Sequence, residues 1–257
     1  MNMFKRKTCS VLLSWLIIAA MTAALIPAAF MMQINEAEAA AMPQSPRVSN
    51  GESTWDCIYY GNYYKESSDS KTPVKWRVLS VNGSEAFLLA DENIDSGILY
   101  NEEGSEDAWA DSNIRSWLNS TFINEAFSSQ EQNAIKSKTI KTPDNPVHQT
   151  AGGADTTDKI FLLSISEVTS KKYGFSTSFT PENTEETDET RLSNNTTYTA
   201  GKKQDGSAGE ADSWALRSPG YGAGYMSYVS YMGHVDTYGC TSGWDYYGVR
   251  PAMYLDW

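Results

Sequence analysis

The clearest pattern of hydrophobic and polar positions in this chain lies in residues 74–90. Residues 74–81 alternate between two kinds of side chain, which is the period-two pattern of a strand with two unlike faces. An Asn-Gly pair follows at 82–83, and the apolar run of residues 86–90 comes next. Because both positions of such a turn must tolerate positive φ, Asn-Gly between two apolar runs predicts a β-hairpin. Residues 57–61 predict an earlier strand that stops at its glycine.

Short helices are predicted after this hairpin. Ser112 is a helix-capping residue, and apolar side chains recur at helical spacing in residues 114–118. Ser128 and Ser164 are each followed by a glutamate three residues later, which is the capping-box pattern. The sequence therefore predicts three helix starts in the first two thirds of the chain.

The second half of the chain has a different texture. Residues 160–163 form a compact apolar run that predicts a buried strand, and residues 180–191 are acidic and predict an exposed loop. From Trp214 onward, the sequence is rich in Gly, Tyr and Trp and predicts many short turns. We expect one α+β domain over residues 54–257, with short helices in its first half and a loop-rich β second half.

The N-terminus predicts export. Lys5, Arg6 and Lys7 precede a mostly apolar run, and Ala-Glu-Ala at 37–39 fits a signal-peptidase site. We therefore interpret residues 1–39 as a signal peptide and residues 40–53 as a mobile lead-in. The alternative is a retained anchor helix, because the apolar run approaches membrane-spanning length.

Charge narrows the classes of partner. The chain has 257 residues and a net charge of -12, which excludes a nucleic-acid binder that works through a basic face. After signal cleavage we expect a secreted or cell-surface protein that binds neither nucleic acid nor membrane.

Few cysteines remain after the export segment. Cys57 and Cys240 are the only two, and an exported protein can form a disulfide between them. The alternative is two separate buried thiols, because spacing alone does not show that the sulfur atoms meet.

Several segments together resemble a widespread, uncharacterised family of exported proteins from Gram-positive bacteria. The resemblance covers nearly all of residues 55–257, and Ala215 departs from it, since the family usually has a second Trp there. The matching segments are residues 74–79 (Val-Lys-Trp-Arg-Val-Leu), 87–89, 112–119, 158–164, 214–220 (Trp-Ala-Leu-Arg-Ser-Pro-Gly) and 248–252 (Gly-Val-Arg-Pro-Ala). This resemblance implies no activity.

The same Arg-Ser-Pro-Gly and Gly-Val-Arg-Pro segments are similar to the ending of C-type-lectin-like folds, including the formylglycine-generating enzyme group. That likeness implies a single mixed domain in which long loops bind the ligand. It does not imply the oxidase activity, which needs a closely placed pair of reactive cysteines.

Motifs for common hydrolytic reactions are missing from the sequence. It contains no G-x-S-x-G elbow and no H-E-x-x-H motif, and His148 and His234 both lie in loops. Residues 91–95 and 155–158 offer oxygen ligands that suit calcium, but neither segment matches an EF-hand loop. We expect no cofactor, and a calcium ion bound by one of these two segments is the alternative. A pair of carboxylates for glycoside cleavage stays an alternative.

The aromatic residues of the last third give the functional hypothesis. Seven of the 15 Tyr lie between Tyr221 and Tyr247, and Tyr and Trp rings suit sugar faces and protein partners. The alternative role for these rings is packing within the core. The alternative role for the two arginines is to connect the Arg-Ser-Pro-Gly segment to the Gly-Val-Arg-Pro segment inside the fold. The expected ligand-binding residues are Tyr225, Tyr228, Tyr231, Tyr238, Trp244, Tyr246, Arg217 and Arg250.

The sequence thus predicts a secreted, non-catalytic recognition domain that binds a cell-wall or extracellular glycan, or a surface protein. The alternative is a carbohydrate-active hydrolase with an unidentified Asp/Glu pair. A purely structural surface protein is a third class.

Overall fold

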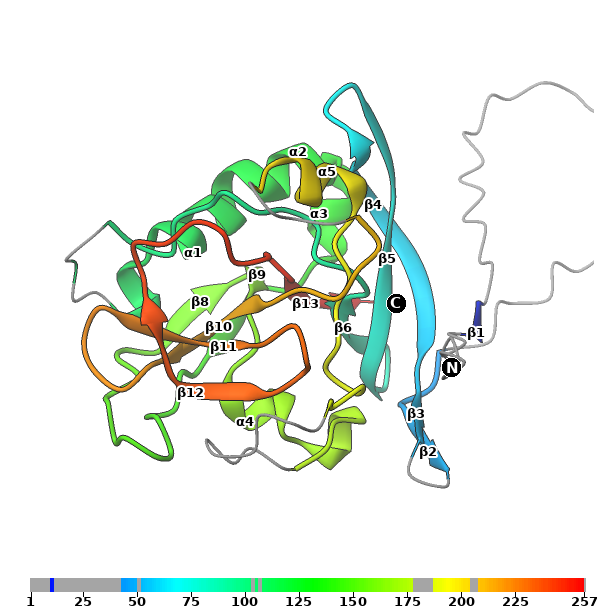
Figure 1. Ribbon diagram of the computed structural model, residues 1–257. Coiled ribbons are helices and arrows are strands. Elements are labelled where there is room, and N and C mark those ends of the chain that lie inside the picture. The colour runs from blue at the N-terminus through cyan, green and yellow to red at the C-terminus, as the bar shows by residue number, and fades with distance from the viewer. Residues whose placement is uncertain are drawn as a thin grey trace, which may run out of the picture.

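A six-stranded sheet extends from the β4–β5 hairpin at the right-hand edge of Figure 1 to β13 and β9 in the middle of the molecule. The computed structural model describes residues 10–11, 43–49, 52–102, 105, 108–177, 187–203 and 208–256. The strand order is β1-β4-β5-β6-β13-β9, and every neighbouring pair except β1–β4 is antiparallel. The strands are β1 (Ser10–Val11), β4 (Asp56–Ser67), β5 (Ser70–Asn82), β6 (Glu85–Ala90), β13 (Ala252–Asp256) and β9 (Ile160–Phe161).

The predicted hairpin is confirmed as β5–β6, with its turn one residue later than expected. Asn82 pairs with Glu85, so Gly83 and Ser84 form the turn. Gly83 has a φ of 60°, the left-handed conformation that glycine adopts without strain.

The predicted strand that stops at Gly61 is in fact much longer. β4 continues through Gly61, which has a φ of 66° and lies where the pairing register with β5 shifts. A Cβ atom there would lie 2.4 Å from the Phe127 ring, so glycine lets β4 bulge against the helical layer.

The helical layer covers one face of the sheet. Ser112 accepts a hydrogen bond from the Arg115 N–H at the start of α1, and Ser128 forms a full capping box, as predicted. Phe122 and Phe127 then pack on Tyr63 and Trp76 of the sheet. This layer comprises the 3-10 helix η2 (Trp109–Asp111), α1 (Asn113–Trp117), the π-helical turn η3 (Leu118–Phe122), α2 (Ile123–Ala126) and α3 (Ser129–Ala134).

Stacked rings form the opposite face. Tyr254 pairs with Phe87 across the β13–β6 ladder, and their rings lie 4.6 Å apart and nearly parallel. Phe161 stacks on both. The capping-box helix α4 (Ile165–Val168) and the 3-10 helix η4 (Lys171–Tyr173) follow this strand, as the Ser164 pattern predicts.

Three small sheets and one more helix complete the fold. The largest, β10-β11-β12, is called the small sheet below, and Figure 1 shows it as a separate layer beside the main sheet. Its strands are β10 (Trp214–Pro219), β11 (Tyr225–Val229) and β12 (Val235–Thr241). The other elements are β2 (Arg47–Ser49), β3 (Glu52–Thr54), β7 (Lys138–Ile140), β8 (Thr156–Asp158) and α5 (Thr197–Gly201).

The α+β class is confirmed, with most of the short helices in the first half. Within residues 40–53, the β2–β3 hairpin replaces part of the expected lead-in. Most of the predicted export segment and of the acidic stretch 180–191 lies outside the described residues. Among the helices of the described part, none has the length and hydrophobicity needed to cross a bilayer.

A buried arginine joins the main sheet to the small sheet. Arg250, which has no exposed surface, donates from Nε to the Ala90 carbonyl at 2.9 Å and from Nη2 to the Asp91 carbonyl at 3.4 Å. Its Nη1 donates to the Arg191 carbonyl at 3.3 Å, and its guanidinium lies over the Trp214 ring at 4.9 Å. A planar group with five donors satisfies several carbonyls at once, which offsets the cost of burying the charge.

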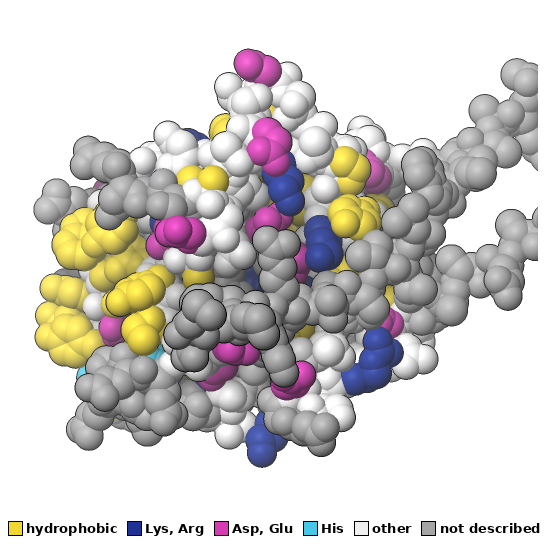
Figure 2. Space-filling view, turned by 45° about the vertical axis from the view of Figure 1, so that its right-hand side comes forward, with side chains coloured by type: hydrophobic (Ala, Val, Ile, Leu, Met, Phe, Trp, Pro, Cys, Tyr) yellow, Lys and Arg dark blue, Asp and Glu magenta, His cyan; other side chains and the backbone are white. Residues whose placement is uncertain are grey.

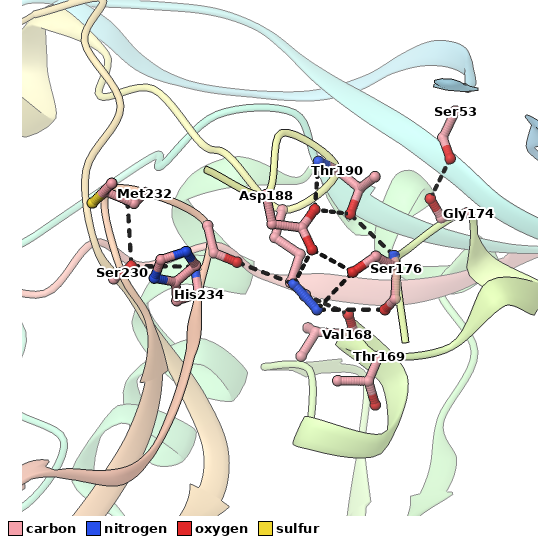
Figure 3. Close-up of polar contacts among 12 residues, drawn as sticks. Ser53, Val168, Thr169, Gly174, Ser176, Asp188, Thr190, Ser230, Met232 and His234 are labelled. Carbon is pink, nitrogen blue, oxygen red and sulfur yellow. Dashed lines mark hydrogen bonds and ion pairs between the residues drawn. The ribbon is translucent and has the colours of Figure 1, made fainter. Parts of the chain in front are cut away.

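A second buried arginine, Arg191, joins loops that include Val168, Ser176 and Asp188, whose positions Figure 3 shows. The Arg191 guanidinium donates to the carbonyls of Val168 at 2.9 Å and Gly233 at 3.2 Å, and it pairs with the Asp188 carboxylate. It also donates to the Ser176 hydroxyl at 3.1 Å. Arg191 thereby fixes the β11–β12 turn against the end of α4.

We expect Arg250→Lys to lower the free energy of unfolding by about 3 kcal/mol, because a lysine leaves buried carbonyls without donors and loses the stacking on Trp214. Urea denaturation measures this. Arg47→Lys is the matched control, since Arg47 is half exposed and its ion pair with Asp56 should change stability by less than about 1 kcal/mol. Equal effects of the two changes would contradict the role given to Arg250.

Candidate functional site

Exposed aromatic rings gather on the small sheet and on the loop that follows β12. Figure 2 shows the hydrophobic side chains there as adjacent groups with acidic side chains close by. Among the described residues, five of the eight large hydrophobic side chains that are exposed lie between Tyr221 and Tyr246. We define the aromatic face as Tyr221, Tyr225, Tyr228, Tyr238, Trp244 and Tyr246, with the buried Tyr247 beneath it.

The first half of this face is a tyrosine cluster. Tyr221 and Tyr238 stack with ring centroids 4.2 Å apart and an interplanar angle of 14°, and Tyr225 lies 4.4 Å from Tyr221. The His148 ring meets Tyr238 edge-on at 5.7 Å. Tyr238 is 55% exposed, so this rigid stack presents ring surface to solvent.

The second half is a tryptophan cluster. Trp244 lies 5.1 Å from Tyr246, Tyr246 stacks on Tyr247 at 4.9 Å, and Tyr247 contacts Tyr228 at 4.8 Å. The Tyr228 hydroxyl donates to the carboxylate of Asp236 at 2.8 Å. Trp244 and Tyr246 therefore lie on a packed base and are not free loop side chains.

A buried asparagine fixes the loop beside the tyrosine cluster. Asn145 Nδ2 donates to the carbonyls of Pro219 at 2.9 Å, Gly220 at 3.1 Å and Thr237 at 2.8 Å. Its Oδ1 accepts from the His148 N–H at 3.0 Å. One side chain thus holds His148 against the rings of β12.

The same loop forms part of the wall of a pocket of about 180 Å³. The loop, α4 and β10 all contribute to its wall. The lining residues are Pro143, Asp144, Pro146, Ile165, Ser166, Thr169 and Ser218. Asp144 is the one carboxylate in this lining, so the pocket does not assemble the acid pair that glycoside cleavage requires.

The two predicted arginines do not reach the aromatic face. Arg217 is 3% exposed, and its Nη1 donates to the Leu162 carbonyl at 2.6 Å and to Glu167 at 2.5 Å. Its Nη2 donates to the Lys141 carbonyl at 2.8 Å. Like Arg250, Arg217 ties segments together inside the fold, and neither has a donor directed to an external ligand.

The other predicted ligand-binding residues are six aromatic side chains, of which five belong to the aromatic face and one does not. Tyr231 is exposed but lies in the β11–β12 turn, at the opposite end of the small sheet from Tyr225 and Thr241. The remaining five share the aromatic face: Tyr238, Trp244 and Tyr246 are exposed, while Tyr225 and Tyr228 are half-buried.

The predicted Cys57–Cys240 disulfide is wrong. Cys240 is a free, buried thiol, so it is not the disulfide partner of Cys57. Burial raises the pKa of the Cys240 thiol to about 12, and this thiol hydrogen-bonds Tyr247 beneath the aromatic face. The two cysteines lie on different sheets, which spacing along the chain does not reveal.

The two segments considered for calcium use their carboxylates within the protein. Asp91 pairs with Arg77 at 2.5 Å and with Lys75 at 2.9 Å, and Asp158 pairs with Arg115 at 2.7 Å. Over the described ranges of the chain, no group of three or more His, Cys, Asp or Glu side chains is placed to hold a metal ion.

The two histidines of the described residues have structural contacts. Figure 3 shows His234 in a turn. The backbone N–H groups of His234 and Met232 both donate to the Ser230 hydroxyl, at 3.2 and 3.3 Å. That arrangement closes a turn. It is not the contact of a base that activates a serine nucleophile, in which a ring nitrogen would face the hydroxyl.

Fold and site together define a mixed α+β domain with a rigid, exposed aromatic face. The chain belongs to a family described as Domain of unknown function (DUF6273), whose model matches residues 84–257. That match begins in the β5–β6 turn, so all of β4 and β5 lies outside the matched region and extends the sheet beyond it. No curated protein and no solved structure matches the chain significantly.

Sequence reasoning missed Tyr221, His148 and Asn145 as parts of this site. Tyr221 belongs to the same tyrosine-rich segment and could have been included. His148 and Asn145 had no such signal, because their contacts are with residues more than 70 positions away in the chain.

We expect the Cys240 thiol to stay unmodified by iodoacetamide in the native protein at pH 8. Alkylation needs the thiolate, and a pKa of about 12 keeps the buried group protonated at that pH. Unfolding in urea without a reductant should expose it to full alkylation, as peptide mass mapping would show. Recovery of a peptide pair cross-linked through Cys57 and Cys240 would contradict the structure.

Proposed function

We propose that this protein is a secreted, non-catalytic recognition domain that binds a glycan through the aromatic face. The single observation behind the proposal is that the exposed rings are packed against one another without a ligand. Tyr221 stacks on Tyr238, and Trp244 packs against Tyr246 in a tilted arrangement. A binding surface that is already ordered loses little conformational entropy on association.

The chemistry of the rings suits a sugar. Flat rings with a polar edge match the apolar faces of pyranose rings, and tyrosine hydroxyls at the rim can bond to sugar hydroxyls. The net charge of -12 disfavours anionic polymers, so the favoured ligand is a neutral glycan. A surface protein is the other partner class, and the binding experiment below distinguishes the two.

We also propose that the domain has a C-type-lectin-like fold. The supporting feature is a mixed fold in which the loops of a small sheet present the rings. The export segment at residues 1–39 supports a location outside the cell or at its surface.

We expect Tyr238→Ala and Trp244→Ala each to weaken glycan binding about 5- to 30-fold, because each removes ring contact worth roughly 1–2 kcal/mol. A glycan array followed by calorimetry with the best neutral ligand measures the affinity. Tyr59→Ala is the matched control, since Tyr59 is exposed on β4, away from the small sheet.

Binding that is unchanged in both face variants, or lost equally in Tyr59→Ala, would overturn the proposal. Chromatography should also show that neutral glycans stay uncleaved after incubation with the protein. Release of reducing ends would favour the hydrolase alternative. If a surface protein binds the aromatic face and no glycan does, the ligand is a protein.

A further inference from the structure

The pocket and the aromatic face share one rigid loop. Pro143, Asp144 and Pro146 line the pocket, and His148, two residues further on, contacts Tyr221 and Tyr238. Asn145, buried between them, holds both sides at fixed positions through its three carbonyl contacts. A ligand lying on the tyrosine cluster can therefore extend a substituent into the pocket.

The pocket is built for a small group that is partly apolar and partly polar. Its volume of about 180 Å³ is below the roughly 300–1,000 Å³ of pockets that hold a whole small molecule. Pro143, Pro146 and Ile165 supply apolar walls. The hydroxyls of Ser166 and Thr169 already donate to the Ser164 hydroxyl and the Ile165 carbonyl. The Ser218 hydroxyl accepts from the Ile165 N–H at 2.9 Å, and no acceptor among the described residues takes its own proton.

Asp144 supplies an acceptor at the rim of the pocket. Its Oδ1 accepts from the Gly152 N–H at 2.9 Å, and among the described residues no donor reaches its Oδ2. A ligand N–H would meet a carboxylate oxygen there, and a hydrogen bond to a charged group is stronger than one between neutral groups.

Buried polar atoms without partners cluster around the same loop. Six buried side-chain atoms in the described part of the chain lack a hydrogen-bond partner, and three of them are Thr142 Oγ1, His148 Nε2 and Thr237 Oγ1. Thr142 precedes Pro143 of the pocket wall, and Thr237 precedes Tyr238 of the face. Unsatisfied buried groups are costly, so their concentration here indicates a place where a ligand or its bound water completes the hydrogen bonding.

We infer that the pocket receives the acetamido group of an N-acetylated amino sugar whose ring lies on the tyrosine cluster. The methyl group packs against the two prolines and Ile165, the amide N–H donates to Asp144 Oδ2, and the carbonyl accepts from the Ser218 hydroxyl. This inference rests on the proposed function, and it narrows the neutral glycan to one that is acetylated on nitrogen.

The test compares two β-1,4-linked tetrasaccharides, of N-acetylglucosamine and of glucose, which differ at the acetamido position. Both are uncharged, so the acidic protein does not bias the comparison. Calorimetry on the full mature chain should give at least tenfold tighter binding of the acetylated tetrasaccharide.

Ser166→Phe fills the pocket and should bring the two affinities to within about twofold. Ser129→Phe is the matched control, because Ser129 is an exposed first-turn position of α3, which begins with the same kind of capping box as α4. Asp144→Ala is a second variant, which should reduce the preference without filling the pocket. Thermal unfolding confirms that each variant is folded.

The outcomes separate the two claims. Equal binding of both tetrasaccharides by the unchanged protein overturns the pocket inference and leaves the aromatic face standing. Binding of neither overturns the inference along with the function on which it rests. A preference that survives both Ser166→Phe and Asp144→Ala places the acetamido group elsewhere and also overturns the inference.

Discussion

The buried guanidinium of Arg250 is the contact on which the arrangement of the two sheets depends. Among the described residues no carboxylate contacts it, and it donates instead to the carbonyls of Ala90, Asp91 and Arg191 while lying over Trp214. Taking a charge out of water is unfavourable unless its donors are used, so this site tolerates few other geometries. The end of β6 and the start of β10 are thereby held close to the segment that leads into β13. The aromatic face is rigid because the small sheet beneath it cannot shift.

Buried arginines recur at each junction of the fold. Arg217 ties β10 to the strand and helix around Leu162 and Glu167, and Arg191 ties the β11–β12 turn to Val168. Each works mainly through backbone carbonyls of loops, which have no partners within a sheet ladder. A loop-rich domain has many such carbonyls, and a five-donor side chain satisfies several of them at once. This explains why a fold with few long helices can still present a fixed surface.

Local signals predicted local structure well. The β5–β6 hairpin, the Ser112 cap and both capping boxes follow from a few neighbouring residues, and all four are present. Contacts between residues far apart in the chain were not predictable from such local signals. Gly61 was interpreted as a strand end, whereas it is a bulge that packs against Phe127, and Cys240 was paired with a cysteine on another sheet. The ring density predicted the aromatic face, but only the register of β11 with β12 shows that Tyr231 lies at its far end.

In the proposed mode of binding, the exposed rings, and not the buried ones, meet the ligand. The ¹⁵N-indole NMR signals of the tryptophans, followed during titration with the acetylated tetrasaccharide, test this. The Trp244 signal should move, whereas the signals of the buried Trp76, Trp109 and Trp214 should keep their positions. Movement of the buried indole signals with an unchanged Trp244 signal would rule out binding on the aromatic face.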